Sequence, residues 1–181
     1  SRCRYLHENL PSVDDSMAKN PINSYYFVEC LNKVSEENHI FINDAGSSNY
    51  ICSQALKLKK GQRELTSGAF YSMGIALPLA IGASATEKDA QVIAITGDGS
   101  IELNIQELRT LSQNNLDVKL FIINNGGYAS IRKSQDELVG GGRYTDDEEV
   151  LNFENVAKAF ELEFEIIDNY ETLEADLAKI L

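Results

Sequence analysis

Asp98 lies between two glycines in the segment Gly97-Asp98-Gly99-Ser100, where an apolar run ends and a helical pattern begins. A glycine-rich turn of this kind typically binds a phosphate through backbone amides at the N-terminus of the helix. A bare carboxylate in the turn would repel that phosphate strongly at a low effective dielectric. The repulsion is removed when a divalent cation lies between the two groups. Mg²⁺ suits this position because it takes an octahedron of oxygen ligands, some from protein and others from substrate phosphates.

Further oxygen ligands are predicted after the next strand along the chain. Val92 to Thr96 and Val118 to Ile123 are apolar runs typical of buried strands, and a helical pattern from Ser100 to Asn114 connects them. Such a unit crosses over right-handed and leaves its strands parallel, so both carboxyl ends lie at the ligand-binding edge of the sheet. Asn124-Asn125 and then Gly126-Gly127 follow the second strand. An asparagine amide oxygen and a carbonyl of the glycine turn are oxygen ligands that suit Mg²⁺.

Each motif alone has a simpler interpretation. An Asp in a turn is usually a cap, and Asn-Asn-Gly-Gly is usually only a turn. Their occurrence at the ends of consecutive buried strands favours a binding site. A Rossmann dinucleotide loop is disfavoured because it needs a third glycine three residues after Gly99, where the chain has Glu102.

The remaining patterns predict the elements that hold these residues. Asp136 to Glu149 contains three glycines and a run of acidic residues and is expected to be a mobile loop. Helices are expected over Ile22–Glu37, Asn49–Leu58, Met73–Ala85, Phe153–Phe160 and Thr172–Leu181, and further strands over His39–Asn43 and Phe164–Ile167. Strands that alternate with helices predict an α/β protein, a three-layer sandwich with a mostly parallel sheet.

Composition excludes several classes of function. The net charge is −12 with no cluster of Lys and Arg, which argues against nucleic acid or an anionic membrane as a partner. The longest apolar run, Met73 to Ala85, is too short to span a bilayer. Cys3, Cys30 and Cys52 are odd in number and widely spaced, which favours a reducing compartment, and we expect a cytoplasmic protein.

The spacing of the two motifs resembles the signature of thiamine diphosphate enzymes, with twenty-four residues between Gly97-Asp98-Gly99 and Asn124-Asn125. "TSGAFYSMGIALPLAIGA" (Thr66–Ala83), "GDGSIELNIQELRTL" and "VKLFIINNGGYASIR" are similar to segments of acetolactate synthases. The resemblance extends from Ile22 to Ile167. It implies the C-terminal, diphosphate-binding domain of an acetolactate synthase-like enzyme. We expect this domain over residues 21–181, a linker over 1–20, and a longer enzyme around them.

The resemblance also implies roles for individual residues. Asp98, the Asn125 side chain and the Gly127 carbonyl would hold Mg²⁺. Met73 would hold the cofactor in its bent shape, and the backbone from Tyr71 to Met73 would hydrogen-bond the aminopyrimidine. Without the resemblance, Met73 would be interpreted as a core methionine. Contacts to the cofactor diphosphate would come from Gly46, Ser47, Ser48, Gly99, Ser100, Tyr128, Ala129 and Ser130.

The resemblance implies decarboxylation of a 2-oxo acid, for which pyruvate is the expected substrate, and transfer of the two-carbon unit to a carbonyl acceptor. Such an enzyme is a transferase or a lyase. Acetolactate synthases have a tryptophan where this chain has Ser134, and the chain contains no Trp, which leaves the acceptor open. A 2-oxo acid decarboxylase without carboligation and a non-catalytic Mg²⁺–nucleotide-binding module stay open as alternatives. The catalytic glutamate is expected from a separate pyrimidine-binding domain of a homo-oligomer. The chain alone is therefore expected to be inactive.

Overall fold

The computed structural model describes residue 5 and residues 12–140 and 151–181, and it divides the chain into two compact units. The sheet unit comprises Glu36–Tyr50 and Lys59–Glu165. The terminal unit comprises Ser1–Ser35, Ile51–Leu58 and Ile166–Leu181. None of the described helices is long and apolar enough to cross a membrane.

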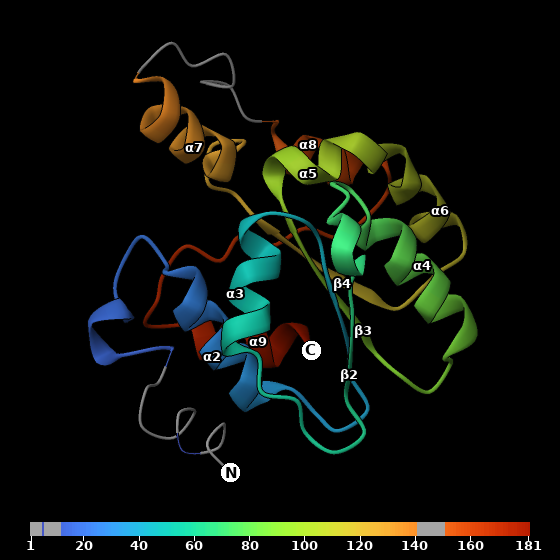
Figure 1. Cartoon of the computed structure of the whole chain (residues 1–181). Coiled ribbons are helices and arrows are strands. Elements are labelled where there is room, and N and C mark those ends of the chain that lie inside the picture. The colour runs from blue at the N-terminus through green and yellow to red at the C-terminus, as the bar shows by residue number, and fades with distance from the viewer. Residues whose placement is uncertain (1–4, 6–11, 141–150) are drawn as a thin grey trace. The chain divides into compact units, whose positions relative to one another are not determined.

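The sheet unit is built on a parallel sheet of β1 (Ile40–Asn43), β2 (Arg63–Leu65), β3 (Val92–Gly97) and β4 (Val118–Ile123). The strand order is β2-β1-β3-β4, and every neighbouring pair is parallel (Figure 1). All residues of β1 and nearly all of β3 are buried, so these strands are covered on both faces. The predicted α/β fold with a mostly parallel sheet is confirmed, and β2 is an additional strand that the sequence patterns did not predict.

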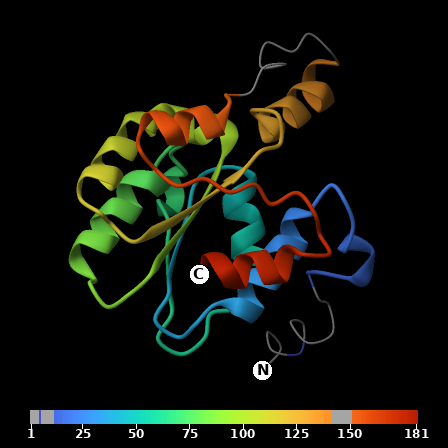
Figure 2. The same cartoon turned by 180° about the vertical axis from the view of Figure 1, so that it is seen from behind.

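One face of the sheet is covered by α4 (Ala76–Thr86). Three alanines of this helix (Ala76, Ala80 and Ala83) are buried against aliphatic side chains of β1 and β3. Small side chains allow the helix to lie close to the sheet. On its other side, Leu77 packs with Leu108 and Leu111 of α6 (Leu108–Gln113), and α8 (Phe153–Ala159) adds Val156 to this cluster. Figure 2 shows α4 and α6 side by side, as the view from the front also does.

The expected helix Ser100–Asn114 is wrong as a single helix. The chain forms α5 (Asp98–Ile101), the 3₁₀ segment η3 (Glu102–Glu107) and then α6. Asn104 leaves helical geometry, with φ −138° and ψ 26°. Its side chain Nδ2 donates a hydrogen bond to the carbonyl oxygen of Gly74 at 2.9 Å. The helix is thus interrupted where Asn104 contacts a segment that is distant in the sequence. The periodicity of apolar residues along the chain does not reveal such a contact.

Two further expectations are corrected. Phe164–Ile167 is not a strand, because this segment does not join the sheet that the described residues form. An apolar pattern predicts burial, but a strand also needs a neighbouring strand. The loop expected over Asp136–Glu149 begins too early: Asp136 belongs to α7 (Ala129–Val139), which ends at Gly140 in the left-handed region with φ 66°. The last part of that expected loop, residues 141–149, lies outside the described residues.

Other boundaries move by a few residues. The helix α3 (Ser47–Ala55) begins two residues earlier than expected, and α4 begins at Ala76 rather than Met73. A 3₁₀ turn, η2 (Gly68–Phe70), precedes Met73. The terminal unit also contains η1 (Asp15–Met17), α2 (Ser24–Val34) and α9 (Leu173–Ile180). The linker expected over residues 1–20 stays a prediction.

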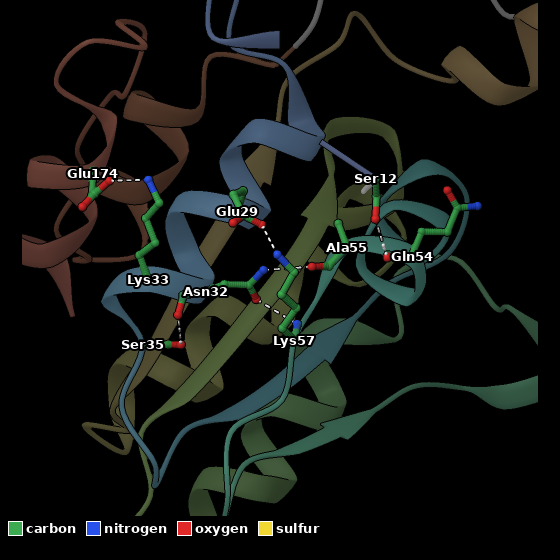
Figure 3. A network of polar contacts seen from close by, with 9 residues as sticks. All are labelled: Ser12, Glu29, Asn32, Lys33, Ser35, Gln54, Ala55, Lys57 and Glu174. Carbon is green, nitrogen blue, oxygen red and sulfur yellow. Dashed lines mark hydrogen bonds and ion pairs between the residues drawn. The ribbon is translucent and has the colours of Figure 1, made fainter. Parts of the chain in front are cut away.

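The terminal unit has its own small core and polar network. Val28 and Leu31 of α2 are fully buried, as are Leu173 and Leu177 of α9. Figure 3 shows the polar network around α2. The amide of Asn32 donates to the carbonyl of Ala55 at 2.8 Å and accepts from the backbone N–H of Lys57 at 2.9 Å, and Lys33 pairs with Glu174 at 3.0 Å.

Candidate functional site

The candidate site lies at the carboxyl edge of the sheet. Because all strands are parallel, the segments that follow β1, β3 and β4 leave the sheet at the same edge. The register pairs Gly97, at the end of β3, with Ile123, at the end of β4. Asp98 and Asn124 each come directly after one of these paired residues, so the two lie close together at the edge of the sheet. This is the juxtaposition that the strand–helix–strand pattern predicted.

The Asp98 carboxylate is the centre of this edge. It is 1 % exposed and accepts three backbone hydrogen bonds. Oδ2 accepts from the N–H groups of Asn125 at 3.0 Å and Gly127 at 2.8 Å, and Oδ1 accepts from Gly99 at 2.9 Å. The structure thus brings Asp98 into contact with the backbone of Asn125 and Gly127, the two other residues of the predicted metal site, and their role as ligands stays a prediction. An ionised carboxylate has about four lone-pair positions, so these three bonds leave room for a cation on Asp98.

The ligand chemistry at this edge is mainly neutral oxygen. Among the described residues, no group of three or more His, Cys, Asp or Glu side chains lies close enough to hold a metal ion. The carbonyl of Gly127 accepts one hydrogen bond, from the N–H of Ala129 at 3.0 Å, and keeps its second lone pair. A cation here would take one carboxylate and several neutral oxygens, which matches the preference of Mg²⁺ for substrate phosphates over an all-carboxylate cage.

The turn after β4 requires its glycines. Gly126 and Gly127 both have positive φ, 79° and 91°, a conformation that residues with a Cβ rarely adopt. This turn directs two backbone N–H groups at Asp98. On its other side, the guanidinium of Arg132 in α7 donates to the carbonyl of Asn125 at 3.0 Å and to the carbonyl of Gly126. Arg132 was missed from the sequence, where it is only one of several charged residues on a helix.

The loop after β1 approaches the start of α7. Gly46 has φ 67°, and a Cβ built on it would lie 3.7 Å from the Ser130 hydroxyl. Ser47 and Ser48 open α3, and the buried Ser48 hydroxyl donates to the Ala45 carbonyl at 2.9 Å. Gly46 and Ser130, both expected at the diphosphate, are therefore neighbours in space, although they lie far apart in the sequence.

Tyr128 explains the second glycine of the Gly-Asp-Gly motif. A Cβ on Gly99 would lie 2.9 Å from Cε1 of the Tyr128 ring, so a side chain at this position would force the ring to move. Gly99 and Ser100 are both buried in the short helix α5. The ring of Tyr128 thus lies against the turn that carries Asp98. Ala129 and Ser130 follow as the first residues of α7.

Met73 lies in the segment between η2 and α4. It is half-buried, and Tyr71, two residues earlier, adopts a left-handed conformation with φ 46° that is uncommon for a side chain of this size. The next residue, Gly74, has φ 77°, and a Cβ on it would lie 3.0 Å from the backbone oxygen of Ser100. The Met73 segment therefore adjoins α5, the helix that Asp98 opens.

Asp44 is a second buried carboxylate at this edge, and the sequence interpretation missed it. It follows β1 directly and is 1 % exposed. Its oxygens accept from the N–H groups of Ala45, Gly74 and Ala76 at 2.8, 2.8 and 3.1 Å, and from the Thr96 hydroxyl at 3.0 Å. The signal that could have found it is the one that identified Asp98, a carboxylate immediately after a buried strand.

Comparisons with known proteins agree with this geometry. Residues 44–181 match the family model described as thiamine pyrophosphate enzyme, C-terminal TPP binding domain. The chain is 32 % identical over 165 residues to the acetolactate synthase isozyme 1 large subunit of Escherichia coli (strain K12), covering 91 % of this chain and 29 % of that protein. It is 38 % identical over 112 residues to the acetolactate synthase large subunit of Cyanidium caldarium, covering 61 % of this chain and 19 % of that protein. It thus spans less than a third of either relative, 29 % and 19 %.

Proposed function

Because the chain belongs to the family of C-terminal TPP-binding domains of thiamine pyrophosphate enzymes, we propose that it binds the diphosphate of this cofactor, thiamine diphosphate, through Mg²⁺. We further propose that it serves an acetolactate synthase-like enzyme. That enzyme would decarboxylate a 2-oxo acid, with pyruvate as the default, and transfer the two-carbon unit to a carbonyl acceptor. The matched relatives, which are large subunits of acetolactate synthases, support this reaction class.

The observation that carries the metal proposal is the Asp98 carboxylate against the turn after β4. It is buried, it accepts from the N–H groups of Asn125 and Gly127, and it belongs to no group of three or more His, Cys, Asp or Glu side chains among the described residues that could hold a metal ion. A buried charge of this kind is stable when hydrogen bonds and a counter-charge accompany it. One carboxylate with an amide oxygen and a carbonyl suits a cation that also takes phosphate oxygens. These residues fit Mg²⁺ bound to a diphosphate.

The same edge offers groups for the rest of the cofactor. When bound, thiamine diphosphate supplies the carbon nucleophile that cleaves and forms carbon–carbon bonds next to a carbonyl. The chain's own part would be to bind and orient it, with Met73 against the bent cofactor and the backbone from Tyr71 to Met73 toward the aminopyrimidine. The diphosphate would be bound by Gly46, Ser47, Ser48, Gly99, Ser100, Tyr128, Ala129 and Ser130.

The acceptor is proposed to differ from that of acetolactate synthases. Ser134 lies on α7 and donates from its hydroxyl to the carbonyl of Ser130 at 3.1 Å, so this exposed position carries a small polar side chain. Position 134 therefore offers no aromatic surface to an acceptor. Product analysis with pyruvate and a panel of carbonyl acceptors would separate carboligation from decarboxylation alone, in which a proton replaces the acceptor.

The remaining parts of the site are proposed to come from elsewhere in the enzyme. A separate pyrimidine-binding domain would supply the catalytic glutamate, and the enzyme would be a cytoplasmic homo-oligomer. The chain's coverage of only 29 % of the Escherichia coli relative supports the presence of further domains in the enzyme.

Calorimetry on the full-length protein tests the proposed cofactor. Thiamine diphosphate, ADP and NAD are titrated separately in the presence of Mg²⁺, and each titration is repeated with EDTA. We expect thiamine diphosphate to bind most tightly and to lose affinity with EDTA. Tighter binding of ADP or NAD would overturn the proposal and favour a nucleotide-binding module on the same fold.

A further inference from the structure

The buried carboxylate of Asp44 has no part in the proposed contacts to the cofactor. A buried carboxylate is costly unless hydrogen bonds satisfy it, and Asp44 accepts from four donors that come from three segments of the chain. One donor is its own neighbour Ala45, and another is the hydroxyl of Thr96 in β3, two residues before Asp98. The other two are backbone N–H groups of the segment that follows Met73. Asp44 therefore connects the strand that leads to the metal site with the Met73 segment.

Gly74 is held from both sides. Its N–H donates to Asp44 Oδ1 at 2.8 Å, and its carbonyl oxygen accepts from Nδ2 of Asn104 at 2.9 Å. The N–H of Gly74 belongs to the same peptide group as the carbonyl of Met73. Because that group is planar, fixing the N–H direction also fixes the direction in which the Met73 carbonyl points.

The surroundings leave Gly74 little freedom to move. A Cβ on Gly74 would lie 3.0 Å from the Ser100 oxygen, from Nδ2 of Asn104 and from Cβ of Leu103. Asn104 reaches this position because the chain departs from helical geometry there, with φ −138°. The break in the predicted helix thus has a consequence for the site, since a regular helix would carry this side chain in another direction.

We propose that Asp44 and Asn104 are positioning residues that fix the backbone at Met73 and Gly74, and so place Met73 for the pyrimidine end of thiamine diphosphate. This inference rests on the proposed function. It assigns the two ends of the cofactor to separate supports, with Asp98 and the turn after β4 at the diphosphate. Loss of a positioning residue should therefore weaken the binding of the whole cofactor while sparing the binding of its diphosphate alone.

The test compares two ligands in the full-length protein. Binding of thiamine diphosphate and of inorganic pyrophosphate, each with Mg²⁺, is measured by calorimetry in wild type and in Asn104→Ala. Asn114→Ala is the matched control, because Asn114 also donates from its amide to a backbone carbonyl, that of Thr110 at 2.8 Å, but at the end of α6. We expect Asn104→Ala to raise the Kd for thiamine diphosphate about threefold to tenfold, the loss typical of one hydrogen bond, with the Kd for pyrophosphate unchanged.

A second readout needs no ligand. Hydrogen exchange of the backbone amides of Gly74 and Ala76 should be faster in Asn104→Ala than in wild type and unchanged in Asn114→Ala. Asp44→Asn keeps the shape of the side chain but turns one acceptor into a donor. We expect this variant to raise the Kd for thiamine diphosphate more than Asn104→Ala does, again with the Kd for pyrophosphate unchanged. If this variant does not fold, the Asn104 variant still decides the question.

The outcomes are distinguishable. Equal weakening of both ligands in Asn104→Ala, or no change in either, would overturn the positioning role while leaving the proposed function intact. Wild-type protein that binds pyrophosphate and a nucleotide but not thiamine diphosphate would overturn the proposed function, and the positioning role with it.

Discussion

The Asp98 carboxylate carries the charge on which the proposed metal site depends. Three backbone N–H groups hold it in place. In Asp98→Asn, the Asn side chain has nearly the same shape and keeps one oxygen, which can accept from the N–H groups of Asn125 and Gly127, while its new NH₂ donor replaces the oxygen that faces Gly99. This substitution therefore removes charge with little change in shape. We expect Mg²⁺-dependent affinity for thiamine diphosphate to fall about 10- to 100-fold, as for the loss of an interaction with a charged group. Calorimetry with and without Mg²⁺ measures this affinity in the variant and in wild type.

The control for Asp98→Asn is Asp117→Asn, the same chemical change just before β4. Asp117 is an exposed carboxylate whose partner is Lys119 at 3.4 Å. We expect wild-type affinity in this variant, because an exposed ion pair contributes little. A similar loss in both variants, or none in Asp98→Asn, would show that Asp98 does not bind the metal.

Arg132 acts on the same site through the backbone. Its guanidinium holds the carbonyls of Asn125 and Gly126, which keeps the turn after β4 in the shape that directs N–H groups at Asp98. In Arg132→Met we expect the Mg²⁺ concentration for half-maximal cofactor binding to rise about threefold to tenfold. Lys133→Met, an exposed residue on the same helix, is the control and should leave it unchanged. Equal shifts in the two variants would contradict a specific role for Arg132.

At the scale of elements, the junction between η2 and α4 depends on a glycine. Gly74 combines a positive φ of 77° with a backbone oxygen 3.0 Å from the position of a Cβ. Gly74→Ala should lower the free energy of unfolding by about 2–4 kcal/mol, from backbone strain and overpacking together. Gly82, within α4, has no heavy atom within 4 Å of a built Cβ, and Gly82→Ala should raise that free energy by up to about 1 kcal/mol. Urea unfolding compares the two variants, and equal stability would count against the tight packing of Gly74.

The start of β1 gives the fold a pH dependence. His39 is buried, and its Nδ1 accepts from the backbone N–H of Glu36 at 3.2 Å, which requires the neutral ring. Burial lowers the pKa of His39, with Glu36 and Asp117 opposing this shift and Lys59 reinforcing it. A lowered pKa means that the folded state binds the proton less readily than the unfolded chain. The contribution to stability is therefore present above the unfolded pKa of about 6.5 and is lost as pH falls.

The measurement is the free energy of unfolding in urea from pH 7.5 to pH 5. In His39→Asn, an amide oxygen can take the place of Nδ1 as the acceptor for the N–H of Glu36, and the side chain does not titrate. We expect His39→Asn to lose less stability than wild type as pH falls through this range. Parallel curves for the two proteins would show that His39 titrates alike in the folded and unfolded states.

At the scale of the whole molecule, the proposed site is confined to the sheet unit. Asp44, Met73, Asp98 and the turn after β4 all lie within it. Large apolar side chains of η2 and α7 are exposed in the same unit, including Phe70 at 89 % and Leu138 at 86 %. Exposed apolar side chains of this size are typical of surfaces that other domains cover. This agrees with the proposal that the catalytic site needs a second domain.

We therefore expect the chain alone not to be an enzyme. The glutamate required for activation of the cofactor is proposed to belong to a separate domain, and without that domain fewer contacts offset the entropy lost when the cofactor binds. The purified chain is assayed for CO₂ release from pyruvate with thiamine diphosphate and Mg²⁺, beside the full-length protein. Turnover at the full-length rate would mean that these residues contain the catalytic base and that the domain assignment is wrong.

The sequence by itself determined three of the four strands and the neighbouring positions of Asp98 and Asn125, two residues of the proposed metal site. The apolar runs that end at Asn43, Thr96 and Ile123 became β1, β3 and β4. The burial that continuous apolar character predicts is found in β1 and β3, whereas all residues of β4 are only half-buried. The right-handed crossover then leaves one arrangement for Asp98 and Asn125, which the hydrogen bond between them confirms.

Only the tertiary structure decided which distant groups meet at that edge. The short strand β2 pairs in parallel with β1, whereas Phe164–Ile167 is not part of the sheet that the described residues form. The break at Asn104 and the four donors on Asp44 follow from how α4 and η3 lie against the sheet. Periodicity measures the burial of a residue along its own segment. It carries no information on which backbone group a buried polar atom contacts, because register and packing between segments set that contact.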